Sequence, residues 1–126
     1  MNAMKAAVIE HRGDRGELKE IAIPQPSPQE ILVRVTAAGV NPIDWKIRDR
    51  GERAMPFVLG QDFAGVVSAA GHDVLKYREG ERIFGIARRG AFAEYTVVPQ
   101  TIPRNRLRRF PMTSVTPMPP PFPRPA

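Results

Sequence analysis

The sequence contains no cysteine and only two histidines among its 126 residues. Without cysteine the protein cannot form disulfides, iron–sulfur clusters, thiolate zinc sites or a thiol nucleophile, and two histidines are too few for an all-imidazole metal site. Its apolar runs are short, since stretches such as residues 63–70 fall well below the roughly 18 residues that a membrane-spanning helix needs. We therefore expect neither a bound metal nor a membrane segment.

A secretion signal is also missing. The amino terminus has no basic segment followed by a long apolar core, and it leads directly into a strand-like run. The default expectation is a cytoplasmic protein, and the length fits one domain of ordinary size.

Charge and proline are unevenly distributed along the chain. Residues 1–100 contain 14 basic and 13 acidic side chains and all ten glycines. Residues 101–126 contain five arginines, no acid, no glycine and eight of the 14 prolines, and they account for most of the net charge of +6. So many prolines cannot sustain a regular ladder of backbone hydrogen bonds. We expect residues 1–100 to fold and residues 101–126 to be a disordered Arg/Pro-rich tail.

Two binding roles can be considered for this tail, one with nucleic acid and one with proline-recognition domains. Its arginines lack the interleaved aromatic residues that stack on bases, so we expect no nucleic-acid partner. The pairs Pro117 and Pro120, and Pro120 and Pro123, have the spacing of ligands for proline-recognition domains, although Arg124 is out of register with both.

Short strands separated by Gly, Pro and Asp dominate residues 1–100. In one of them Ile31, Val33 and Val35 alternate with polar residues, which is the period of a half-buried strand. This pattern predicts a mainly β fold, a barrel or sandwich of about six strands. The expected strands are residues 5–10, 18–23, 31–36, 63–70, 82–86 and 91–98.

One short helix is well specified. Asn41 is a favourable N-cap, Pro42 suits the first helical position, Asp44 falls at the third, and Gly51 follows the last turn. The sequence therefore predicts a helix over Pro42–Arg50, and residues 77–81 suggest a tight turn rather than a second helix.

Five sequence blocks, in this order and spacing, resemble the amino-terminal GroES-like domain of the medium-chain dehydrogenases/reductases. Within that superfamily they are most similar to the zinc-independent quinone oxidoreductase branch. The resemblance covers about residues 4–99. The blocks are VRVTAAGVNPIDWKIR (33–48), LGQDFAGVV (59–67), GHDV (71–74), EGERIFG (79–85) and GAFAEYTVV (90–98).

The resemblance implies a GroES-like β-barrel whose cleft faces a separate Rossmann domain carrying NADPH. In zinc-dependent members a cysteine ligand stands where this chain has Asn41, and a Gly-His-Glu segment stands where it has Gly60, Gln61 and Asp62. Amides are poor zinc ligands beside thiolate or imidazole, so the residue chemistry agrees with a metal-free site.

The implied reaction is hydride transfer from a nicotinamide to a quinone or enone, a small-molecule substrate. Such a reaction needs hydrogen-bond donors for the oxygen on which negative charge develops. No catalytic residue is certain. The candidates for the substrate and cofactor cleft are Asn41, Trp45, Lys46 and Gln61.

Each candidate also has a structural interpretation. Asn41 and Asp44 form a plausible capping pair, Trp45 could pack in the core, and Lys46 could be a solvated charge on the helix. Four further residues are expected to have structural roles, the glycines by permitting tight backbone geometry. They are Asp44, Gly60, Asp62 and Gly65.

The family pattern stops near residue 100, where the composition changes, and the chain contains no G-x-G-x-x-G phosphate-binding turn. We therefore expect a truncated member without its Rossmann domain, inactive alone. A different class of function is also open, a non-catalytic β-barrel interaction module that uses the basic tail. Unpaired strand edges would favour association, and a homo-oligomer is one way to cover them.

Overall fold

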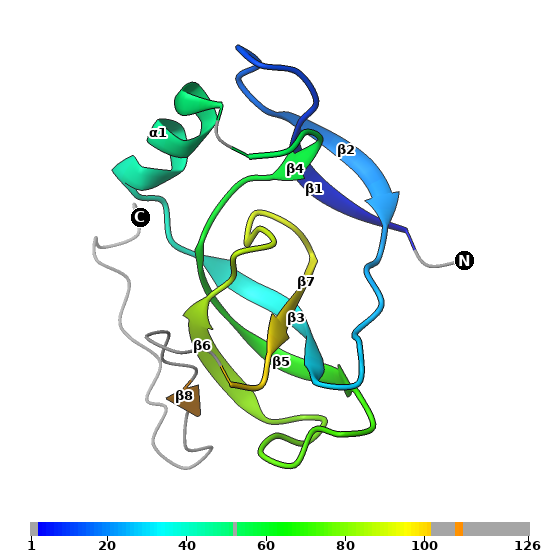
Figure 1. Cartoon of the computed structure of the whole chain (residues 1–126). Coiled ribbons are helices and arrows are strands. Elements are labelled where there is room, and N and C mark those ends of the chain that lie inside the picture. Colours follow the sequence, from blue (N-terminus) through cyan, green and yellow to red (C-terminus); the bar gives the residue numbers. More distant parts are fainter. Residues whose placement is uncertain (1–2, 52, 102–107, 110–126) are drawn as a thin grey trace, which may run out of the picture.

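The computed structural model describes residues 3–51, 53–101 and 108–109. Within these ranges the chain forms eight strands and one helix (Figure 1). They are β1 (Ala3–Ile9), β2 (Glu17–Ala22), β3 (Glu30–Ala38), α1 (Pro42–Arg50), β4 (Phe57–Val58), β5 (Asp62–Ala70), β6 (Arg82–Ile86), β7 (Tyr95–Pro99) and β8 (Arg108–Arg109).

The strands form two antiparallel sheets. The smaller has the order β2-β1-β4, and the larger has the order β7-β3-β5-β6-β8. β1 and β2 form a hairpin in register from Ala3 opposite Ala22 to Val8 opposite Glu17. In the larger sheet β3 is paired on both sides, with β5 and with β7. The mainly β fold predicted from the sequence is confirmed.

The segment just before β7 joins the two sheets. Glu94 N–H donates to the Lys5 carbonyl in β1, and the Glu94 carbonyl accepts from Val35 N–H in β3, at 3.1 and 2.8 Å. Ala7 N–H also donates to the Phe92 carbonyl at 2.8 Å. Residues 91–94 were expected to belong to a strand over 91–98, and that expectation is wrong, because these residues cross between the sheets and β7 begins only at Tyr95.

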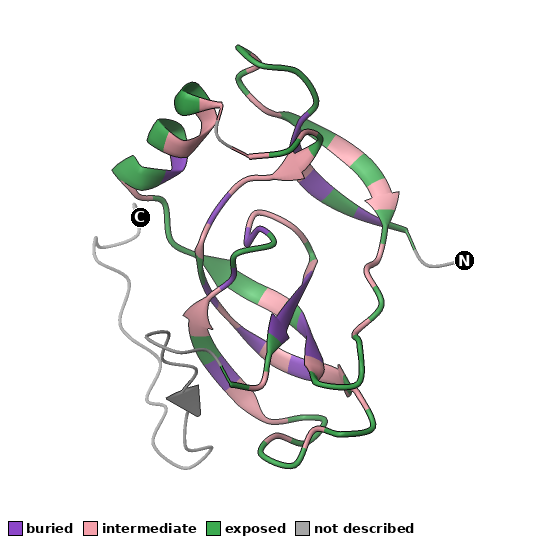
Figure 2. Ribbon diagram, viewed as in Figure 1, coloured by how far each residue is buried: buried purple, intermediate pink, exposed green. Residues whose placement is uncertain are grey.

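The core follows the alternation of the strands (Figure 2). Ile31 and Val33 are fully buried as predicted, whereas Leu32 is also buried at 9% exposure because the β3–β5 register shifts between Leu32 and Val33. A smaller apolar cluster lies on β1. The main cluster contains Ile31, Val33, Phe63, Val67, Ile83, Ala87, Ala91 and Val98.

The helix α1 has the predicted bounds. The sequence patterns did not predict the two-residue strands β4 and β8. β4 and β8 are too short to show a period of two. β8 pairs Arg109 with Ile83 and Arg108 with Phe84, so these two tail residues lie along β6.

Residues 102–107 and 110–126 lie outside the described residues, and the disorder expected for the tail stays a prediction. No helix in the described part of the chain is long and apolar enough to cross a membrane.

A buried hydroxyl in β7 offers a test of the core. Thr96 is 2% exposed, and its Oγ1 has no hydrogen-bond partner among the described residues. We expect Thr96→Val to raise the free energy of unfolding by about 1 kcal/mol, because the variant no longer buries an unsatisfied hydroxyl. Urea denaturation measures the change.

Thr36→Val is the matched control for that substitution. The Thr36 hydroxyl donates to the Ala64 carbonyl at 3.0 Å and lies on an exposed position of β3. This variant loses a satisfied hydrogen bond, so it should gain no stability. Equal effects of the two substitutions would show that the Thr96 hydroxyl is satisfied in solution.

Candidate functional site

Asn41 and Asp62 meet where β3 ends and β5 begins. Asn41 Nδ2 donates to Asp62 Oδ2 at 2.7 Å, and Gly39 N–H donates to the Asp62 carbonyl at 3.0 Å. A Cβ on Gly39 would lie 3.2 Å from Asp62 Cβ and 3.6 Å from Asn41 Nδ2. The loop and the strand therefore pack closely, and this contact joins the first two sequence blocks in space. Asp62 acts here as a positioning group for the Asn41 amide.

The start of α1 holds Asn41 from the other side. Asp44 Oδ2 accepts from Asn41 N–H at 2.8 Å, and Asp44 N–H donates to the Asn41 carbonyl at 3.0 Å. These bonds are the cap expected of Asp44 at the third helical position. Asp44 is the buried residue of α1, and its Oδ1 has no partner among the described residues. The capping interpretation of Asn41 and Asp44 is therefore confirmed, and the Asn41 side chain is held by Asp62. Its role in the cleft stays a prediction.

Gln61 is fixed through its backbone. The Gln61 carbonyl accepts from Ala87 N–H at 2.7 Å, and the neighbouring Gly60 carbonyl accepts from Ala91 N–H at 3.1 Å. Gln61 borders a narrow crevice with Asp44 and Phe57 that has no room for a water molecule. Its carboxamide has no hydrogen-bond partner in the described part of the chain, so both its donor and its acceptor are available.

Gly60 and Gly65 take the roles that the sequence suggested, for steric reasons. Gly60 has φ +94°, and a Cβ there would overlap the Phe92 ring. A Cβ on Gly65 would collide with the Arg34 carbonyl of the neighbouring strand. Both glycines therefore allow close approach within the fold and do not depend on a ligand.

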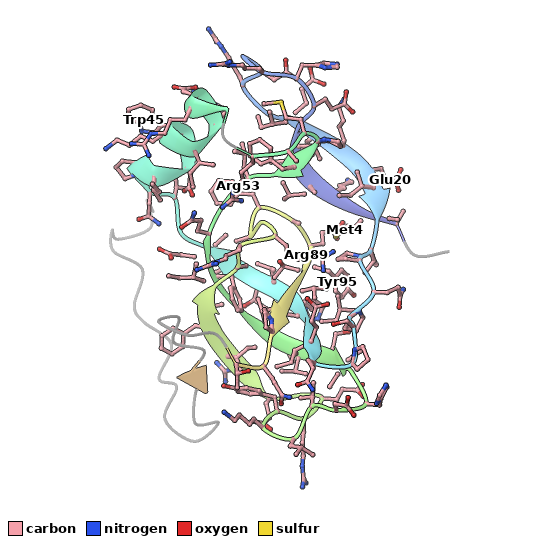
Figure 3. The ribbon with its side chains drawn as sticks, in the orientation of Figure 1. Met4, Glu20, Trp45, Arg53, Arg89 and Tyr95 are labelled. Carbon is pink, nitrogen blue, oxygen red and sulfur yellow. The ribbon has the colours of Figure 1, made fainter. Side chains whose placement is uncertain are left out.

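Trp45 and Lys46 lie apart from this group. Trp45 is 52% exposed, so the core-packing interpretation is wrong. Lys46 is exposed, with its Nζ 5.7 Å from the centre of the Trp45 ring. In Figure 3 Trp45 projects from α1 away from the sheets. The fold joins Asn41 to Asp62, the residue after Gln61, and leaves Trp45 and Lys46 exposed on α1.

Two residues that shape the site were not singled out from the sequence. Gly39 packs on Asp62, and Phe92 packs on Gly60. Both stand inside the sequence blocks described above, but only their tertiary neighbours show why these residue types are needed.

The donor set is a poor fit for zinc. It consists of two amides and one carboxylate, with neither thiolate nor imidazole. Among residues 3–51, 53–101 and 108–109, no group of three or more His, Cys, Asp or Glu side chains gathers. The arrangement instead offers neutral hydrogen-bond donors to an oxygen atom.

Comparison with known proteins identifies close relatives of this domain. Residues 27–103 match the family described as alcohol dehydrogenase GroES-like domain. The trans-enoyl reductase FMN2 of Fusarium mangiferae is 43% identical over 97 residues, which cover 75% of this chain and 25% of that protein. The quinone oxidoreductase of Sus scrofa is 37% identical over 82 residues, covering 62% and 25%. The chain thus spans about a quarter of the length of these relatives.

Solved structures show the same fold. The cobalt- and zinc-bound thermostable alcohol dehydrogenase of Pyrobaculum aerophilum superposes with a TM-score of 0.71 at 32% identity, over 78% of this chain and 40% of that one. The relatives therefore include proteins named for quinone and enoyl reduction as well as a zinc-bound dehydrogenase.

Proposed function

This chain belongs to the alcohol dehydrogenase GroES-like domain family, and we propose that it forms the substrate side of a metal-free, NADPH-dependent quinone or enone reductase site. The observation that carries the proposal is the Asn41 amide, which Asp62 holds at the meeting point of β3 and β5, with the unpaired Gln61 carboxamide on the residue that precedes Asp62. Relatives named as quinone oxidoreductase and trans-enoyl reductase support this substrate class.

The amides would act on the oxygen of the substrate. When bound, a reduced nicotinamide supplies the hydride, and negative charge then develops on the carbonyl oxygen of the acceptor. Asn41 Nδ2 uses one N–H on Asp62 and keeps a second, and the Gln61 carboxamide is unpaired among the described residues. A donor held in place before the reaction, as Asp62 holds the Asn41 amide, stabilises such charge without reorganisation.

Zinc plays no part in this proposal. The cobalt- and zinc-bound dehydrogenase of Pyrobaculum aerophilum is structurally similar to this chain, but amides at positions 41 and 61 are not the ligand types that zinc prefers. Polarisation of the acceptor oxygen is therefore assigned to hydrogen bonds.

The dinucleotide would be held by another part of the functional enzyme. The sequence has no G-x-G-x-x-G turn. The residues that flank Asn41 in the sequence include Val40 and Ile43, whose exposed fractions are 83% and 38%. An exposed apolar group of this kind is suited to a partner surface, and we assign it to the part that carries the nicotinamide. We expect the 126-residue chain alone not to reduce quinones.

A chimaera tests the proposal. Residues 4–101 of this chain replace the corresponding domain segment of the quinone oxidoreductase of Sus scrofa, and NADPH-dependent reduction of a quinone is measured. We expect activity in the chimaera, and we expect Asn41→Ala and Gln61→Ala each to lower kcat/KM about tenfold, because each removes a hydrogen bond to developing charge.

Lys46→Ala is the matched control, since Lys46 is exposed and lies apart from the amides; its chimaera should retain near-normal kcat/KM. A folded chimaera that binds NADPH but reduces neither quinones nor enones would contradict the proposal. It would instead favour a non-catalytic interaction module, which saturable binding of a protein partner to the 126-residue chain would support.

A further inference from the structure

Two hollows adjoin each other beside β4. The inner cavity, of about 170 Å³, lies where β1, β2 and β7 approach one another. The second hollow is lined by Arg53, Arg88 and Arg89, and we call it the arginine basin. It is more open than the inner cavity and has a volume of about 420 Å³. Val58 and Arg89 line both hollows, so the two lie next to each other. Figure 3 shows Met4, Arg89 and Tyr95 close to one another at this place.

The inner cavity is mainly apolar. Its walls include Met4, Ile21, Val58, Ala93 and Val97. A cavity of about 150 Å³ with such walls is large enough to bind benzene. The inner cavity therefore suits one aromatic ring or a short alkyl chain.

The arginine basin carries positive charge that the described residues do not neutralise. It is lined by Arg53, Arg88 and Arg89, and no acidic side chain lines it. Arg53 Nη1 donates to the Arg88 carbonyl at 2.9 Å, and its guanidinium lies 5.9 Å from the centre of the Phe57 ring. Neither Arg53 nor Arg88 forms an ion pair with a described residue.

Arg89 has a carboxylate neighbour, but at long range. Arg89 Nη1 is 3.6 Å from Glu30 Oε2, whereas Glu30 Oε1 accepts from Ser27 N–H at 2.9 Å. Burial raises the pKa of Glu30, but the hydrogen bonds from Ser27 and the charge of Arg89 outweigh it, and the pKa lies below its usual range. The carboxylate of Glu30 thus offsets the charge of Arg89 alone, and the charges of Arg53 and Arg88 have no ion-pair partner among the described residues.

We propose that the arginine basin and the inner cavity form one binding site for a small amphipathic anion. Its carboxylate or phosphate lies on Arg53, Arg88 and Arg89, and its apolar group, about as large as a benzene ring, enters the inner cavity. Guanidinium groups form paired hydrogen bonds with carboxylate and phosphate oxygens, which fits this head group. The cavity size selects a small molecule, since a nucleic acid or a membrane surface has no such single apolar group to insert.

This site is separate from the proposed reaction, because binding needs no hydride transfer. Titrations of the 126-residue chain followed by amide NMR shifts locate and measure binding directly. The probes are phenyl phosphate and benzoate, with inorganic phosphate, benzyl alcohol and benzylamine for comparison. Phenyl phosphate or benzoate should shift the amides of Val58, Arg89 and Tyr95, and should bind at least tenfold tighter than benzyl alcohol or inorganic phosphate. Benzylamine should not bind.

Arg88→Gln should weaken binding of the anionic probes about tenfold, because it removes a charged hydrogen-bond donor. Its side chain is exposed and has no role in the described fold, so the variant should remain folded. Arg50→Gln, exposed at the end of α1, is the charge-matched control and should bind normally. Ala93→Leu fills the inner cavity and should abolish the advantage of phenyl phosphate over inorganic phosphate.

Three results would overturn the proposal. These are shifts confined to other surfaces, equal binding of benzyl alcohol and benzoate, or unchanged affinity in Arg88→Gln. If Ala93→Leu does not fold, the comparison between Arg88→Gln and Arg50→Gln decides the question alone. Comparison of benzoate with phenyl phosphate then shows which head group the site prefers.

Discussion

Gly60→Ala is expected to lower the free energy of unfolding by about 3 kcal/mol, the sum of two costs. Gly60 has φ +94°, a conformation that alanine adopts only with strain. The added Cβ would also lie 2.7 Å from Phe92 Cγ and 2.8 Å from Phe92 Cε1, so the ring would have to move. Chemical denaturation followed by far-UV circular dichroism measures the loss.

Gly80→Ala separates the two costs. Gly80 has φ +90°, but no atom lies within 4 Å of the position of its Cβ. It should therefore show the conformational cost alone, about 1 kcal/mol. Combining Gly60→Ala with Phe92→Leu should recover part of the loss, because the smaller side chain relieves the overlap. Equal losses in Gly60→Ala and Gly80→Ala would mean that the Phe92 ring yields without cost.

The Gly60 substitution also bears on function. Gly60 precedes Gln61, whose carbonyl is fixed by Ala87 N–H at 2.7 Å. A displaced Phe92 ring would shift this segment and the amide that we assign to the substrate. In the chimaera we therefore expect Gly60→Ala to lower kcat/KM even at temperatures where the protein is folded.

Ile83→Ala is expected to cost about 3 kcal/mol of stability. Ile83 is fully buried in β6 and belongs to the main cluster with Phe63 and Val67. Its truncation removes apolar contacts and leaves a cavity that strands on both sides of the cluster cannot close. For a domain of about 100 residues this is a large part of a total stability of about 5–10 kcal/mol.

Ile43→Ala provides the same chemical change on the surface. Ile43 is 38% exposed on α1, and alanine is the better helix former. The expected change is within about 0.5 kcal/mol of zero. If thermal and urea unfolding gave the two variants the same stability, the main cluster would not be the source of the stability of this fold.

The local sequence patterns predicted those elements whose signals lie within a few residues. The cap at Asn41 and Asp44, with Pro42 and Gly51, gave the bounds of α1 because capping is a local hydrogen-bonding rule. The bounds of β6 were also correct, since a strand of five residues is long enough to show its pattern. β4 was missed because two residues carry no period, and its existence depends on pairing with β1.

Residue types suggested the members of the candidate site. Only contacts between residues far apart in the sequence showed which of these members are held in the fold and which are exposed. Asn41 and Gln61 were chosen for their amides, and the hydrogen bond from Asn41 to Asp62 joins residues 21 positions apart. Trp45 could equally have packed in the core, and no local signal distinguished the two outcomes. Its exposure follows from the orientation of α1 on the sheets, which buries Asp44 instead.

The sequence by itself determined the absence of cysteine chemistry and the bounds of the helix, because composition and caps are local properties. The resemblance of its sequence blocks to the family implied that amides at positions 41 and 61 replace zinc ligands. Tertiary structure alone decided that residues 91–94 cross between the sheets, that Phe92 requires glycine at position 60, and that Arg53, Arg88 and Arg89 line one basin. Each of these depends on contacts between residues far apart in the chain, which are set by how the two sheets pack and carry no signature in any single stretch of sequence.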